Sequence, residues 1–423
     1  MKLHKSFLLG WVLIVTVIGM CHTQLYAIEN SVDFDQYPST VISNEYVKMK
    51  VYLPDPENGV YRATRYDWSG MIGSVQYKGH EYFGFWKDAY DPMVGIFGPV
   101  DTYKTAGLGY DEAKPGESFI RIGVGFIEKE DEPEYDYHNS YKLVDHGKWT
   151  IDTGNDWMTF THLISSDFGY GYIYTKTLKL KDDGFIIQHK LQNTGVKAIA
   201  TDQYNHNFFM IDHEKCGPSF EISYPYPVST EDDLKGFMEV KDNTLHFTKE
   251  LEKGNVFMGL KGYSEKVKDN KFTIENTKSG TGVTVTVDKP LTKLDFWTNG
   301  RVICPENTIQ LTVKPGQEEV WTSDYSLFVK EVRQQNRAAR AAKRPQYLET
   351  GGEKETQRPL QENPLREICF WTCITRRQSV TRNARSLSMP TVGAGRWEKV
   401  DADIAPSRDV IIERTVQFFV DHL

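Results

Sequence analysis

The stretch FIIQHKLQNTGVKAIATDQYNHNFFMID, residues 185–212, carries most of the information about fold and function in this chain. An apolar-rich strand ends in Leu191-Gln-Asn193-Thr-Gly195, and a second strand follows and delivers Asn205-His206-Asn207-Phe208-Phe209. A His between two Asn residues, followed by two Phe residues, sets hydrogen-bonding groups beside flat apolar faces. This combination is typical of a site that grips a sugar ring.

The rest of the chain from Glu45 to about Val329 has the period-two alternation of strands. Alternating segments lie at 46–53, 171–180, 185–191, 282–288, 308–313 and 321–328. Lys181-Asp-Asp-Gly184 joins two of them, and its Asp-Gly pair predicts a tight hairpin because it supplies positive φ angles. Many short strands with turn signals between them predict an all-β protein, a large antiparallel β-sandwich over residues 28–330.

The pairing of L-x-N-T-G at 191–195 with N-H-x-[YF]-F at 205–209 resembles the galactose mutarotase (aldose 1-epimerase) superfamily. The resemblance implies the mutarotase supersandwich fold, and it implies that His206 is the catalytic acid. Exported members of the group carry a Glu beside a Pro, then a strand, a Pro-Gly turn and a final aromatic strand. Pro305-Glu306 matches that order, so Glu306 is the candidate base.

Interconverting the anomers of a free sugar needs two proton transfers, and we expect the acid and the base on opposite sides of the ring. The base takes the proton of the anomeric hydroxyl while the acid protonates the ring oxygen. An imidazole and a carboxylate suit these roles near neutral pH. The reaction requires no cofactor and no metal. The expected activity is that of an isomerase, with a free hexose, a sugar acid or an oligosaccharide as partner.

Further residues are candidates for binding the sugar. The segments 62–70 and 107–123 resemble parts of exported mutarotase-like proteins. The substrate-binding candidates are Arg65, Trp68, Arg121, Asn205, Asn207 and Phe208. Arg side chains donate paired hydrogen bonds to hydroxyls, whereas Trp68, Trp86 and Phe208 offer flat apolar surfaces. On a strand, Asn205 and Asn207 point away from His206.

The chain also departs from the well-characterised galactose mutarotases. It lacks their Asn-Arg-Ile and His-Gly-Gly blocks, so no motif assigns a second substrate-binding His, and His80, His138 and His146 are candidates by position only. For His206 the alternative is a core His with both nitrogens bonded, and for Glu306 it is a loop carboxylate in water. Two other functions stay open: a non-catalytic carbohydrate-binding protein, and a sandwich related to polysaccharide lyases or hydrolases.

The N-terminal segment and the net charge predict where the protein is located and which partners it lacks. Residues 1–27 have the layout of a signal peptide, with a basic start, an apolar core at 7–20 and Ala27 at the cleavage point, which predicts export to the periplasm or the outside. That core is too short for a comfortable membrane span, which takes about 20 residues. The net charge of −8 argues against nucleic acid as a partner. Oligomeric state is left open.

The segment 331–423 differs in composition from the rest. It holds 16 basic and 12 acidic residues, against 34 and 46 before it. Such a break, with little apolar periodicity, predicts a poorly ordered or helical tail without an assigned function. Cys216 and Cys304 are expected to be buried small residues, with a disulfide between them as the alternative.

Overall fold

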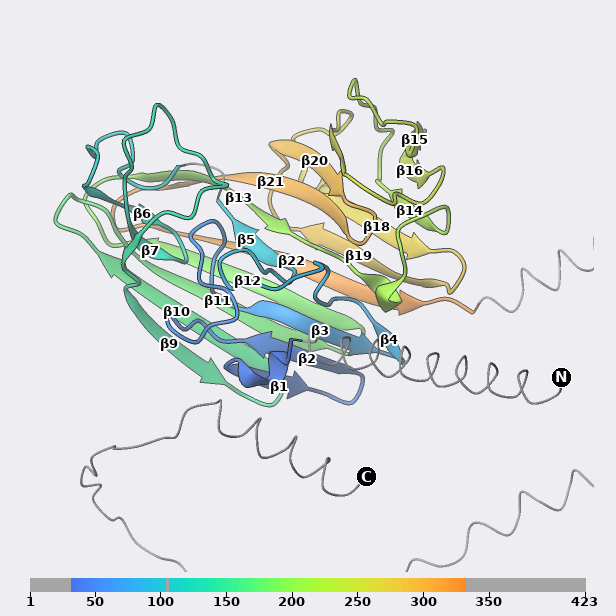
Figure 1. Cartoon of the computed structure of the whole chain (residues 1–423), viewed down its shortest axis with the longest axis horizontal. Helices are drawn as coiled ribbons and strands as arrows, with labels where there is room; N and C mark the ends of the chain where they lie inside the picture. Colours follow the sequence, from blue (N-terminus) through green and yellow to red (C-terminus); the bar gives the residue numbers. More distant parts are fainter. Residues whose placement is uncertain (1–31, 104–105, 332–423) are drawn as a thin grey trace, which may run out of the picture. The chain divides into compact units, whose positions relative to one another are not determined.

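The computed structural model of the protein describes residues 32–103 and 106–331, and the regular secondary structure of these residues is almost entirely antiparallel strands (Figure 1). The all-β fold class and the antiparallel sandwich predicted from the sequence are confirmed. The predicted signal peptide and the tail from residue 332 lie outside the described residues. Three short 3₁₀ helices are present in the described part, η1 (Phe34–Gln36), η2 (Ile211–His213) and η3 (Val267–Asp269). Within that part, no helix has the length and apolar character needed to cross a membrane.

A ten-stranded sheet forms the base of the sandwich. Its strands in spatial order are β15 (Met238–Lys241), β16 (Thr244–Phe247), β14 (Phe220–Ser223), β18 (Lys271–Asn276), β19 (Thr281–Val287), β22 (Glu318–Val329), β12 (Gly184–Asn193), β11 (Gly171–Lys181), β10 (Trp157–Ser165) and β9 (Lys148–Thr153). Alternate residues of its central strands are buried, as on β11, where Tyr174, Lys176 and Leu178 are buried and Lys179 is exposed. The sheet therefore packs on one face.

Three smaller sheets complete the fold. A five-stranded sheet contains, in order, β17 (Val256–Gly259), β20 (Lys293–Thr298), β21 (Ile303–Val313), β13 (Ile199–His206) and β5 (Val100–Thr102). A four-stranded sheet consists of β1 (Ser39–Ser43), β2 (Val47–Tyr52), β3 (Met71–Tyr77) and β4 (His80–Glu81). A three-stranded sheet consists of β6 (Ser118–Arg121), β7 (Gly125–Glu128) and β8 (Leu143–Asp145).

Two of these sheets cover the packed face of the ten-stranded sheet. Val51 and Ile72 of the four-stranded sheet share one hydrophobic core with Phe160 and Leu178 of β10 and β11. On the five-stranded sheet, Gln203 accepts a hydrogen bond from the indole of Trp321 on β22, 3.1 Å between heavy atoms. The five-stranded sheet thus has an inner face against β22, β12 and β11, and an outer face directed away from them.

The hairpin predicted at residues 181–184 is present, but its turn differs in detail. Lys181 pairs with Gly184, so Asp182 and Asp183 form the two-residue loop and Gly184 opens β12. Gly184 has a φ of 152°, and a Cβ there would lie 2.0 Å from the carbonyl oxygen of Tyr325. Glycine is required at this position by the close approach of β22 rather than by the turn alone.

Candidate active site

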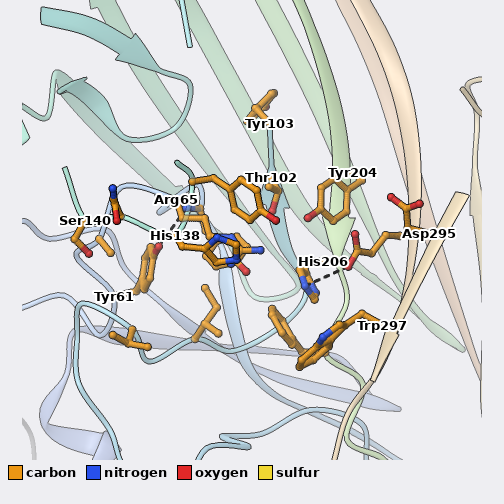
Figure 2. Close-up of a pocket in the computed structure, with 18 of the residues that line it drawn as sticks. Tyr61, Arg65, Thr102, Tyr103, His138, Ser140, Tyr204, His206, Asp295 and Trp297 are labelled. Carbon is orange, nitrogen blue, oxygen red and sulfur yellow. Dashed lines mark hydrogen bonds and ion pairs between the residues drawn. The ribbon is translucent and has the colours of Figure 1, made fainter. Parts of the chain in front are cut away.

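A cavity of about 720 Å³ lies over the outer face of the five-stranded sheet. Thr102, Tyr204 and Glu306 line it from β5, β13 and β21. Strands β6, β17 and β20 and the loops that precede β3, β5 and β8 supply further walls. Figure 2 shows His206 and Trp297 on one side of the view and Tyr61 and Ser140 on the other. The volume of the cavity is typical of a small-molecule site.

His206 is the last residue of β13, and the motif upstream helps to fix that strand. The Asn193 side chain donates to the carbonyl oxygens of Lys197 and Val313, at 2.8 Å each, and accepts from the amide of Gly195. These bonds tie the connection between β12 and β13 to the end of β21. At its other end, β13 pairs with β5, where His206 lies opposite Val100.

His206 and Glu306 are in contact. His206 Nε2 lies 3.4 Å from Glu306 Oε1, and both side chains are about nine-tenths buried or more (Figure 2). Glu306 is therefore held on strand β21, opposite Asp295 of β20, instead of lying in a solvated loop. The two groups lie side by side on one wall, whereas the sequence predicted an acid and a base on opposite sides of a bound ring.

Aromatic side chains fix the imidazole plane. The ring of Phe208 stacks on His206, with centroids 3.8 Å apart and planes 5° apart, and it also stacks on Trp86 at 5.2 Å. Tyr66 and Trp297 meet the imidazole edge-on at 6.0 and 5.9 Å. Phe208 and Trp86 thus occupy the place expected for an aromatic wall beside the candidate acid.

Several Tyr side chains line the same cavity. Burial raises the pKa values of Tyr61, Tyr66 and Tyr204, and the charge of Glu306 adds to the rise at Tyr204. All three stay protonated at any physiological pH. Sequence reasoning missed these residues because Tyr is frequent throughout the chain.

Asn205 and Asn207, expected to bind substrate, do not line the cavity. The Asn205 amide donates to Asp101, and its oxygen accepts from Ser323 Oγ at 3.0 Å. The Asn207 oxygen accepts from Tyr325 Oη at 2.8 Å. Both side chains are buried between the sheets. This corrects the substrate-binding prediction, since the alternation of a strand sends them to the inner face when His206 faces outward.

Trp68 is also absent from the cavity walls. It is buried, and its indole nitrogen donates to the carbonyl oxygen of Ala63 at 2.8 Å, so it is a core residue. Arg65 and Arg121 do line the cavity. Arg121 is buried and donates to the carbonyl oxygens of Ala106 and Arg65, which gives it a role in holding the loops together.

Of the three histidines that position alone suggested, His138 lines the cavity. His80 bonds Asp212 at 2.8 Å at a separate surface hollow, and His146 lies outside both. Asp295 and Trp297 are cavity residues that the sequence did not single out, although the alternation Lys293-Leu-Asp-Phe-Trp297 is a strand signal. Lys87 and Tyr137 come from loops, where no periodic signal could have found them.

Two further features bear on chemistry. Cys216 and Cys304 are free and buried, as expected. Burial raises the pKa of Cys216 to about 12 and also raises the pKa of Cys304, so both remain thiols. Among residues 32–103 and 106–331, no group of three or more His, Cys, Asp or Glu side chains is arranged to hold a metal ion.

No family model and no curated protein matches the chain. Solved structures similar to it include a galactose mutarotase-like protein from Lactobacillus casei, with 13% identity over 69% of this chain and 100% of that chain and a TM-score of 0.44. A GalM/aldose epimerase homologue from C. elegans has 12% identity over 69% and 100%, with a TM-score of 0.44. A putative aldose 1-epimerase from Escherichia coli K12 has 11% identity over 69% and 99%, with a TM-score of 0.41.

Proposed function

We propose that the protein is an aldose 1-epimerase-like enzyme that interconverts the anomers of a free sugar. The contact between His206 and Glu306 on the wall of the cavity carries the proposal, because an imidazole and a carboxylate in one buried site form an acid–base pair. The resemblance of 205–209 to the superfamily motif assigns the acid role to His206.

The side-by-side arrangement suits this reaction. The ring oxygen and the anomeric oxygen are bonded to the same carbon, so an adjacent acid and base can reach both from one side. Glu306 would accept the proton of the anomeric hydroxyl while His206 donates to the ring oxygen. After the ring opens, rotation about the bond between C1 and C2 presents the other face of the aldehyde, and the same two groups reverse their roles during closure.

Anomer exchange measured by NMR on a panel of aldoses and uronates tests the proposal. We compare wild type with His206→Gln and Glu306→Gln, at a pH where spontaneous mutarotation is slow. General acid–base catalysis is worth about 10²–10⁴-fold, so each variant should lose most of the acceleration.

The chain offers a matched control. His246 and Glu221 form another His–Glu pair, 3.5 Å apart, outside the cavity. His246→Gln and Glu221→Gln should therefore leave the exchange rate unchanged. Binding without any acceleration by wild type would instead identify a carbohydrate-binding protein and contradict the enzyme proposal.

A further inference from the structure

The cavity carries an excess of positive charge in an acidic protein. Its charged lining residues are Arg65, Lys87, Arg121, Lys293, Asp295 and Glu306, four cations against two carboxylates. The chain as a whole has a net charge of −8. Because the surrounding protein is acidic, cations gathered at one cavity favour an anionic ligand there.

The two carboxylates are already engaged with other groups. Asp295 pairs with Lys293 at 2.9 Å, and Glu306 contacts His206 at 3.4 Å. Neither Arg65 nor Lys87 forms an ion pair with a described residue. The carboxylates of Asp91 and Asp136 act on Lys87 and Arg65 only through space, without a direct ion pair.

Arg65 is held in a fixed plane. Its guanidinium carbon lies 4.7 Å from the ring centroids of both Tyr66 and Tyr137. Its Nε is buried and makes no hydrogen bond to any described residue. A guanidinium that is oriented by rings and retains free donors is prepared to bind a carboxylate or phosphate through two hydrogen bonds.

Lys87 adds a second positive charge near Arg65. Its Nζ donates to the carbonyl oxygen of Val94 at 2.7 Å. Burial lowers the pKa of Lys87, and the nearby charge of Arg65 lowers it further. Two cations that repel each other in a partly buried site are stabilised when an anion binds between or beside them.

The separation between Arg65 and the His206–Glu306 pair matches the length of one sugar ring. Arg65 lies 4.7 Å from the Tyr66 ring, and that ring lies 6.0 Å from the imidazole of His206. The guanidinium carbon of Arg65 and the imidazole centroid of His206 are therefore no farther apart than the sum of these two distances. A pyranose with a hydrogen bond at either end is long enough to bridge such a gap.

We propose that the substrate is an anionic monosaccharide, whose carboxylate or phosphate binds Arg65 and Lys87 while its anomeric carbon lies at His206 and Glu306. The placement of the anomeric carbon rests on the proposed function. The recognition of the anion rests on the charges of the cavity alone.

Titration calorimetry at low salt tests the inference, with glucuronate, glucose 6-phosphate and glucose as ligands. Wild type should bind at least one of the two anions about tenfold or more tightly than glucose, the effect of one charge-assisted hydrogen bond. Arg65→Gln should remove that preference, because it should weaken the binding of the anions about tenfold more than the binding of glucose, and Lys87→Met should reduce the preference. The anion that binds more tightly identifies carboxylate or phosphate as the recognised group.

Arg62→Gln is the matched control, because Arg62 is three residues away, lies outside the cavity and donates to the carbonyl oxygen of Glu57. It should bind all three ligands as wild type does. Equal affinity of wild type for glucose and both anions, or an equal loss for all three ligands in Arg65→Gln, would overturn the inference. Anion preference without anomer exchange would contradict the enzyme proposal alone, and exchange of neutral sugars without anion preference would contradict this inference alone.

Discussion

The two faces of the five-stranded sheet use similar residues for different purposes. On the inner face, Asp101, Gln203 and Asn205 bond to one another, since Asp101 accepts from both amides, and to the ten-stranded sheet. On the outer face, His206 and Glu306 border a cavity. The inner network leaves no room for a ligand, whereas the outer pair has space beside it. Neighbouring polar residues on one strand can thus divide between structure and chemistry.

The inner face contains a charged centre. Lys176 is fully buried, with its Nζ 2.7 Å from Asp101 and 3.6 Å from Asp67, and His189 lies 3.0 Å from Asp101. Burial opposes the ionisation of Asp101, but His189 and Lys176 outweigh burial and lower the pKa of Asp101. The carboxylate is therefore maintained as an ion in the interior by its partners.

Replacing that lysine should have the largest effect on stability. Lys176→Met leaves two carboxylates without their shared cation, and breaking a buried ion pair costs about 3–5 kcal/mol. Urea denaturation should show this loss in the free energy of unfolding. Lys179→Met, an exposed position on the same strand, is the control and should change it by less than about 0.5 kcal/mol. A loss as small as that in Lys176→Met would mean that the inner network is not structural.

His162 is a core histidine, whereas His206 lines the cavity. His162 of β10 is fully buried, stacks on Trp149 with ring centroids 4.0 Å apart, and bonds the carbonyl oxygen of His146. Burial lowers the pKa of His162 to about 3. Below about pH 6.5 the unfolded chain binds a proton at this residue and the folded chain does not, so stability is lost as the pH falls.

From pH 7 to pH 5 this one residue should cost about 2 kcal/mol of stability. Denaturation of wild type and His162→Gln at both pH values measures it, because the contributions of other groups are common to both proteins. The variant should lose about 2 kcal/mol less than wild type on acidification. Parallel pH dependence in the two proteins would contradict the depressed pKa.

Much of the fold could be predicted from the sequence because strand alternation is a local property. The segments at 171–191 and 308–328 became the long strands β11, β12, β21 and β22. Their pairing across more than a hundred residues, such as Gly184 with Ser326, could not be predicted, since it depends on contacts between distant parts of the chain.

The candidate site could be predicted only for those of its residues that lie on strands. Strand alternation placed Asn205 and Asn207 opposite to His206, but their partners on β22 depend on register between two sheets. Arg65 came from a motif-like segment, whereas Lys87 comes from a loop whose path no periodicity determines. Trp68 was misassigned because it packs in a hydrophobic core whose members come from distant parts of the chain.

The smallest predicted effect is on stability. It tests whether hydrogen bonds on the inner face of the five-stranded sheet hold His206 in place on the outer face. Tyr325→Phe removes the donor to Asn207 Oδ1, which is buried next to the residues of the site. Losing one neutral hydrogen bond should cost about 1 kcal/mol of unfolding free energy. Because Tyr325 does not line the cavity, anomer exchange at saturating sugar should stay within a factor of two of wild type. A large loss of exchange with little loss of stability would show that Asn207 holds His206 in place, and the two faces would then not be independent.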